Sequence, residues 1–271
     1  MNKKKNITLC FLAILDLDVH EQVVPTIRTN IIDANLDFYF TVMVNIDNYQ
    51  RHGCRGTALE IENCYKQLET GNCTVKIVAH PDRRGVNLSY IDLCERFINS
   101  DSEYCIYFDD DHEIINPVVF DDFYHILNDD EIYHLAAGRK EGQKTFSHEN
   151  IFLQDKILHD LKTVVVYEND RSFHTQPGTI ISKKQASIVL QQLSPSVFSG
   201  HEKESIEDLV GKTKFFRSSH VHTIFYKTDD MKLDFSAKTE GWVLPLKNHF
   251  AYDRIRASSG QSGANLRDFN N

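Results

Sequence analysis

The sequence lacks the cysteine spacing of a structural zinc site and the long apolar run of a membrane-spanning segment. Its six cysteines include no C-x-x-C pair, which argues against a zinc knuckle. The apolar run at 7–15 is far too short to cross a bilayer. Tryptophan occurs once, and no internal repeat is visible. These absences leave an ordinary folded domain as the simplest expectation.

Basic residues are also in the minority. The net charge of −9 opposes a surface dedicated to polyanions, although a local basic groove is compatible with it. Hydrophobic content of 41% and charged content of 25% are typical of a folded soluble protein. A length of 271 residues suits one large α/β domain or two small ones.

The amino-terminal segment resembles a secretory signal, with basic residues before the apolar run 7–15. However, Asp16 and Asp18 follow the run directly, without a small-x-small cleavage site. We therefore expect a buried first strand. Cys10 would lie inside this strand as a free thiol, so a reducing, cytoplasmic location is the simplest prediction.

Apolar runs rich in β-branched residues alternate with segments of helical periodicity. Strands are predicted at 7–15, 38–46, 74–80 and 104–108, and helices at 21–35, 58–68 and 89–98. This alternation predicts an α/β fold with a mostly parallel, Rossmann-like central sheet flanked by helices. Further along the chain we expect helices at 117–127, 183–193 and 200–211, and strands at 132–138, 163–167, 179–181, 215–216 and 221–226.

Three carboxylates, Asp109, Asp110 and Asp111, end the apolar run 104–108. Neighbouring carboxylates repel one another, and burying an unpaired one costs several kcal/mol. A divalent cation would neutralise them, at the strand end where α/β proteins gather their sites. A solvated acidic loop is the alternative interpretation.

Four features, read in order, resemble the nucleotide-sugar-dependent glycosyltransferases of the GT-A fold, most closely the inverting, family-two-like group. They are the polar end of the second strand, a D-x-D-like triplet, a glycine-led strand and an E-D pair: Asp47, Asp109 to Asp111, Gly178, and Glu207 with Asp208. No Q-x-x-R-W segment follows the E-D pair, which opposes a processive polysaccharide synthase.

The resemblance implies one catalytic domain over 1–255 and a polar tail over 256–271. Within the domain, 1–115 would bind the nucleotide and 116–255 would form a smaller, acceptor-binding half.

The resemblance also implies the ligands of the site. A Mn²⁺ or Mg²⁺ ion would be held by Asp111 and Asp109, with His222 or His220 as a further ligand. His112 is interpreted as a neighbour of the site. The nucleotide-sugar donor would contact Asp47, Arg84, Asp109, Asp110 and Gly178. Asp110 has an alternative, because successive residues of an extended segment face opposite sides.

For the transfer step, the resemblance implies a carboxylate that takes the proton of the acceptor hydroxyl. Asp208 is the predicted base and Glu207 the second choice, with inversion at the anomeric carbon. Alternatively, Glu207 and Asp208 belong to a solvated helix face, as charge runs usually do.

The predicted function is metal-dependent transfer of a hexosyl or pentosyl group from a nucleotide sugar to a hydroxyl acceptor. A glycan is the first choice of acceptor, with a nucleic-acid base as an alternative. A nucleotidyltransferase of similar fold would carry a glycine-rich loop after its first strand, and the segment 16–20 contains no glycine. A catalytically inactive nucleotide-sugar-binding module is the non-enzyme alternative. Neither the donor nor the oligomeric state is evident from the sequence.

Overall fold

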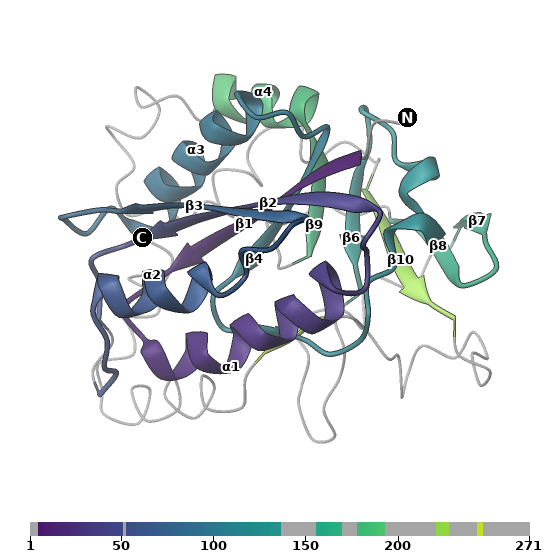
Figure 1. Ribbon diagram of the computed structural model, residues 1–271. Coiled ribbons are helices and arrows are strands. Elements are labelled where there is room, and N and C mark those ends of the chain that lie inside the picture. Colours follow the sequence, from purple (N-terminus) through teal and green to yellow (C-terminus); the bar gives the residue numbers. More distant parts are fainter. Residues whose placement is uncertain are drawn as a thin grey trace, which may run out of the picture.

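The computed structural model describes residues 5–50, 53–136, 156–169, 178–192, 221–227 and 243–245. One twisted sheet of nine strands forms the centre, in the order β3-β2-β1-β4-β9-β6-β10-β8-β7. Helices lie on both faces of this sheet (Figure 1). The predicted α/β class with a central sheet flanked by helices is confirmed.

The first four strands form the parallel part of the sheet. They are β1 (Lys5–Ala13), β2 (Phe38–Ile46), β3 (Cys73–Ala79) and β4 (Tyr104–Asp109). β1 pairs in parallel with β2 on one side and with β4 on the other. The near-continuous apolar runs of β1, β2 and β4 follow from this position, because helices cover both faces of a parallel sheet.

Two pairs of helices enclose the sheet (Figure 1). Helices α1 (Leu17–Ile27) and α2 (Ala58–Lys66) lie on one face, and α3 (Gly85–Ile98) and α4 (Lys183–Gln192) lie on the other. Each face has its own buried apolar cluster. Alternate residues of β4 point into the two clusters, with Ile106 and Phe108 toward α1 and Cys105 and Tyr107 toward α3.

The other five strands of the large sheet have mixed directions. They are β6 (Ile132–Leu135), β7 (Lys156–Asp160), β8 (Val164–Asn169), β9 (Thr179–Ser182) and β10 (Val221–Tyr226). β9 runs antiparallel to β4, so it brings residue 178 beside the end of β4. A separate two-stranded sheet joins β5 (His112–Ile114) to β11 (Val243–Pro245).

Two helix predictions differ from the structure. The helix expected at 21–35 begins at Leu17, so Pro25 lies inside it, and it continues as a single π-helical turn, η1 (Arg28–Ile32). The helix expected at 117–127 consists of two 3₁₀ turns, η2 (Phe120–Asp122) and η3 (Tyr124–Ile126).

Side-chain and backbone contacts explain the second difference. Val118 N donates to the Asn30 carbonyl of η1 at 2.8 Å, and Phe120 N donates to Asn35 Oδ1 at 2.8 Å. The Val118 carbonyl, which would accept from Asp122 N in an α-helix, accepts instead from Asn35 Nδ2 at 2.6 Å. The remaining bonds within the segment join residues three apart, which gives 3₁₀ turns. β5, β7 and β11 are strands that the sequence did not predict.

The predicted elements at 200–211 and 215–216 lie outside the described residues, as does the tail 256–271. The division into nucleotide-binding and acceptor-binding halves stays a prediction. None of the helices in the described ranges combines the length and apolar character needed to cross a bilayer.

The chain order creates a switch point between β1 and β4. From β1 the chain moves outward to β2 and β3, then returns across the opposite face through α3 to reach β4. The connection that leaves β1 thus runs through α1 on one face of the sheet, and the connection that enters β4 runs through α3 on the other. A crevice at such a point is the usual ligand site of an open α/β sheet.

Candidate active site

The acid triplet stands at this switch point. Asp109 is the last residue of β4 and lies opposite Leu12 of β1. Phe108, just before it, is fully buried and stacks on Phe11, with ring centroids 5.3 Å apart. The apolar half of the strand thus fixes the acids at the edge of the sheet.

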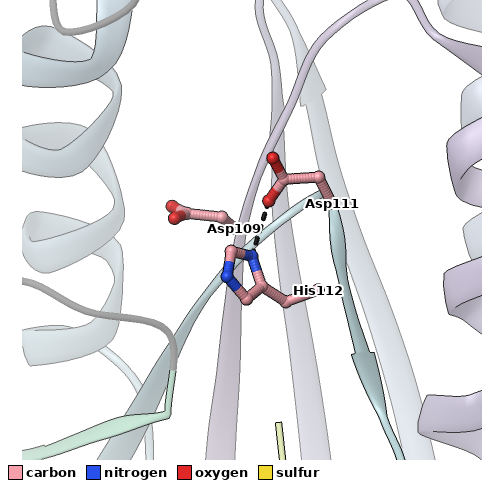
Figure 2. Close-up of side chains that lie close together, drawn as sticks. All are labelled: Asp109, Asp111 and His112. Atoms are coloured by element: carbon pink, nitrogen blue, oxygen red, sulfur yellow. Dashed lines mark hydrogen bonds and ion pairs between the residues drawn. The ribbon is translucent and has the colours of Figure 1, made fainter. Parts of the chain in front are cut away.

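Three of the side chains here lie together. One ligand atom from each of Asp109, Asp111 and His112 falls within 4.8 Å of the others. His112 Nδ1 is 2.5 Å from Asp111 Oδ1, the contact dashed in Figure 2. Asp111 is buried, whereas Asp109 and His112 are partly exposed. From the sequence, His112 was interpreted only as a neighbour of the site. Its position directly after the triplet was the signal that could have identified it as a member of the group.

Burial and neighbouring charges shift the pKa values of Asp109 and His112. Burial raises the pKa of Asp109 to about 7; His112 counteracts this rise, whereas the Asp111 and Asp110 charges add to it. For His112, burial lowers the pKa, but the Asp111 carboxylate outweighs that effect and the pKa lies above its ordinary value. The group therefore tends to hold protons near neutral pH.

These residues fit a divalent cation. Carboxylate oxygens are the preferred ligands of Mg²⁺ and Mn²⁺. A cation would compensate the charge of the buried Asp109 carboxylate and its repulsion by Asp111 and Asp110, taking the place of the proton. The His112 ring orients the Asp111 oxygen that faces it. The Asp109 carboxyl lies at the end of β4 and is partly exposed.

Asp110 faces the other way. Its Oδ2 accepts a hydrogen bond from the Ile14 backbone N–H at 3.0 Å and lies 3.9 Å from His20 Nε2. β4 ends at Asp109 and the next two residues form a turn, in which Asp111 stays in the group of Asp109 while Asp110 turns toward α1.

A second polar group lies along the same edge, at the ends of β2 and β3. The buried Asp47 accepts a hydrogen bond from the Arg84 backbone N–H at 2.7 Å. The exposed Arg84 guanidinium lies 3.5 Å from His80 Nδ1, and burial together with that guanidinium lowers the pKa of His80. With β1 between β2 and β4, Asp47 and the acids stand about 10 Å apart across two strand spacings.

Gly178 lies on the other side of β4. Its N–H donates to the Tyr107 carbonyl at 2.7 Å, and its own carbonyl accepts from Leu135 N at 3.0 Å. Its φ of +91° lies in the region that favours glycine. The chain therefore passes close to the end of β4 at this residue.

The structure does not bring His222 to the acids. On β10 it lies opposite Tyr133, and the register leads from Tyr133 to Ile180 and from Ile180 to Ile106. Three strand spacings separate β10 from β4, which is roughly 14 Å. His222 instead lies 3.1 Å from Glu131 Oε2. Asp208, Glu207 and His220 lie outside the described residues.

The fold and the position of the acids define a class. A Rossmann-like sheet with an acidic group at the end of the fourth parallel strand is the GT-A fold, as the sequence predicted. No family model matches the sequence, and no curated protein is detectably similar to it.

The similarity is to solved structures of S. aureus TarS, a GT-A family-two glycosyltransferase. One TarS structure matches with a TM-score of 0.53 and 12% identity, over 93% of this chain and 39% of that one. The TarS 1–349 structure gives 0.54, 12%, 93% and 64%. The same segment in complex with UDP gives 0.53, 11%, 93% and 64%. The chain thus spans less than two thirds of the TarS chains, and the likeness shows the fold.

Proposed function

We propose that the protein is a metal-dependent glycosyltransferase that moves a sugar from a nucleoside diphosphate donor to a hydroxyl acceptor. The observation that carries this proposal is the convergence of Asp109, Asp111 and His112 at the switch point of a GT-A fold. The UDP complex of the structurally similar TarS makes a uridine diphosphate sugar the first donor to test.

In this proposal the edge of the sheet binds the donor along its length. Asp47 and Arg84, at the ends of β2 and β3, contact the nucleoside side, and an arginine fork suits phosphate oxygens. Asp109 and Asp111 hold the divalent ion, which would supply Lewis-acid stabilisation of the departing diphosphate. The backbone at Gly178 would line the place of the donor sugar.

Asp208 is proposed as the base that takes the proton of the acceptor hydroxyl, with Glu207 beside it. General-base help is worth roughly 10²–10⁴-fold in rate. We therefore expect D208N to retain donor binding and to lose transfer by such a factor. Proton NMR of the product would show an inverted anomeric centre; a retained centre would contradict the assignment of this base.

A panel of nucleotide sugars and nucleotides tests the donor proposal. Thermal unfolding is measured for each compound with Mn²⁺ and with EDTA. We expect at least one nucleoside diphosphate sugar to raise the unfolding midpoint only when Mn²⁺ is present. D37N is the matched control for substitutions of Asp109 and Asp111. It removes an exposed acid before β2, at the opposite edge of the sheet.

Two outcomes of this panel would reject the proposal in favour of another function. A metal-dependent shift with nucleoside triphosphates alone would favour the nucleotidyltransferase alternative. Binding of a donor without turnover in the presence of a broad set of acceptors would favour an inactive binding module.

A further inference from the structure

The peptide at the end of β1 is held from two directions. Ile14 follows the last ladder residue, Ala13, and its neighbours on the sheet no longer supply both of its backbone bonds. Its N–H donates to Asp110 Oδ2 at 3.0 Å, and its carbonyl lies 2.9 Å from His20 Nε2. The same carbonyl also accepts from the Asp16 backbone N–H at 2.8 Å. Two side chains and one local backbone bond thus replace the strand ladder at the point where the sheet opens.

These two side chains come from different elements and meet on the α1 face of the sheet. Asp110 follows the end of β4, and His20 belongs to α1, which follows β1. Both are buried, His20 at 0% exposure and Asp110 at 6%. Nε2 of His20 donates to the Ile14 carbonyl. The same nitrogen lies 3.9 Å from Asp110 Oδ2, so the N–H dipole also lies close to the carboxylate.

The loop that follows Ile14 is anchored in the same way. Leu15 N donates to the Tyr49 carbonyl at 2.8 Å, and Leu17 N donates to the Arg55 carbonyl at 2.7 Å. The β1–α1 connection therefore bridges the end of β4 and the loops after β2. In the proposed function, it lies between the metal-binding acids and the nucleoside-binding side chains.

We propose that Asp110 is a positioning residue, which with His20 braces the Ile14 peptide and so fixes the distance between the ends of β1 and β4 at the donor site. This inference rests on the proposed function, and it replaces the predicted contact of Asp110 with the nucleotide. Asp110 acts through the Ile14 N–H, whereas Asp109 and Asp111 act on the metal.

The brace also explains why an acid occupies the middle of the triplet. A carboxylate oxygen accepts a charge-assisted bond from a buried N–H, which is stronger than a neutral bond. The Asp110 side chain faces α1, and its bond to the Ile14 N–H fixes the backbone at residue 110. This backbone conformation places Asp109 and Asp111 in one group. Loss of the brace would let the ends of β1 and β4 separate, and a displacement of about 1 Å is enough to weaken a metal site.

Three variants test the brace: D110A, D110N and H20L. Affinity for UDP with Mn²⁺ is measured by calorimetry, and protection of the Ile14 amide is measured by hydrogen exchange in the absence of ligand. For D110A we expect an affinity loss of about 10–100-fold, the size seen when residues that support metal ligands are lost, together with faster exchange at Ile14. D110N keeps an oxygen that can accept the Ile14 bond, so it should restore most of both properties.

Coupling between the two side chains is the sharper readout. Because both act on one peptide, the double variant D110A/H20L should lose little more affinity than either single variant. S102A is the control for a lost buried hydrogen bond, because Ser102 accepts from Thr8 before β4 begins, at the opposite edge. We expect S102A to lower the unfolding midpoint without changing the affinity.

The results separate this inference from the proposed function. If the unsubstituted protein binds UDP with Mn²⁺ and D110A binds it equally well, the positioning role is wrong. If D110N loses as much affinity as D110A, Asp110 acts through its charge on the ligand, and the brace is again wrong. If the unsubstituted protein binds no nucleotide, the proposed function fails and takes the positioning role with it, whereas Ile14 exchange still reports on the brace itself.

Discussion

Two histidine–carboxylate pairs in this fold look alike and differ in their surroundings. His112 pairs with Asp111 at 2.5 Å at the open end of β4, beside a second carboxylate. His222 pairs with Glu131 at 3.1 Å inside the sheet, where the Tyr133 hydroxyl also donates to Glu131 at 2.8 Å. In the first pair the carboxylate is buried and a further acid lies beside it, whereas in the second pair the histidine is buried and the Glu131 carboxylate is partly exposed.

The difference teaches which feature indicates a site. A buried histidine beside a carboxylate is common in structural networks, so the pair alone has little value as evidence. At the end of β4 a further carboxylate, Asp109, lies beside the pair; burial raises its pKa to about 7, and the charges of Asp111 and Asp110 add to the rise. That excess charge, more than the histidine, is what a divalent ion would satisfy.

The largest expected effect separates the two pairs by ligand binding. D111N removes a charged oxygen from the proposed ion site, and we expect the Mn²⁺-dependent affinity for UDP to fall by about 100-fold, or roughly 2.7 kcal/mol. Calorimetric titration measures this loss. D37N should bind as the unsubstituted protein does, and an equal affinity in D111N would remove Asp111 from the site.

The His222–Glu131 pair should respond in stability instead. H222Q replaces a buried ring beside Glu131, and E131Q removes the charge that faces His222 and accepts from the Tyr133 hydroxyl. We expect each to lower the free energy of unfolding by about 1–3 kcal/mol. Urea unfolding measures this change. Both variants should bind Mn²⁺ and UDP unchanged. A loss of metal affinity in H222Q, with E131Q unaffected, would restore His222 as a ligand.

The smallest expected effect is a gain of stability in D109N without metal. The folded state holds the Asp109 proton up to about pH 7, whereas the unfolded chain releases it near the ordinary aspartate pKa of 3.8. Stability from this proton is therefore present below pH 4 and is lost as the pH rises through 7. At pH 8 in EDTA, D109N should unfold at a free energy higher by about 1–2 kcal/mol, because several acids share the repulsion.

The pH dependence of stability checks the same prediction. Between pH 4 and 7 the unsubstituted protein should lose stability relative to D109N, and Mn²⁺ should bind more tightly as the pH rises because it competes with the proton. A stability difference that is independent of pH would show that Asp109 is not the titrating group.

The parallel part of the fold could be predicted from the sequence for a physical reason. β1, β2 and β4 are buried on both faces, so their apolar runs are long and end abruptly in polar residues. Because the apolar run of β4 ends abruptly, the sequence also predicted that the acids lie at the carboxyl end of this strand. The alternation of side chains along a strand predicted that Asp110 could turn away from its neighbours.

The rest depends on contacts between distant parts of the chain. β5 is three residues long and forms by pairing with β11, more than a hundred residues later, so no local pattern indicates it. The segment after it is held by Asn30 and Asn35, which removes the predicted helix. His222 lies in a position that sequence spacing could not specify, because the order of β9, β6 and β10 in the sheet is set by tertiary pairing.

One measurement tests the central claim most directly: titration of Mn²⁺ into the protein in the presence of UDP, followed by electron paramagnetic resonance of the free ion. The account predicts that one equivalent of Mn²⁺ loses its free-ion signal with the unsubstituted protein and with H222Q, and keeps it with D111N. Loss of the signal in D111N to the same extent as in the unsubstituted protein would contradict the assignment of the metal site to the end of β4.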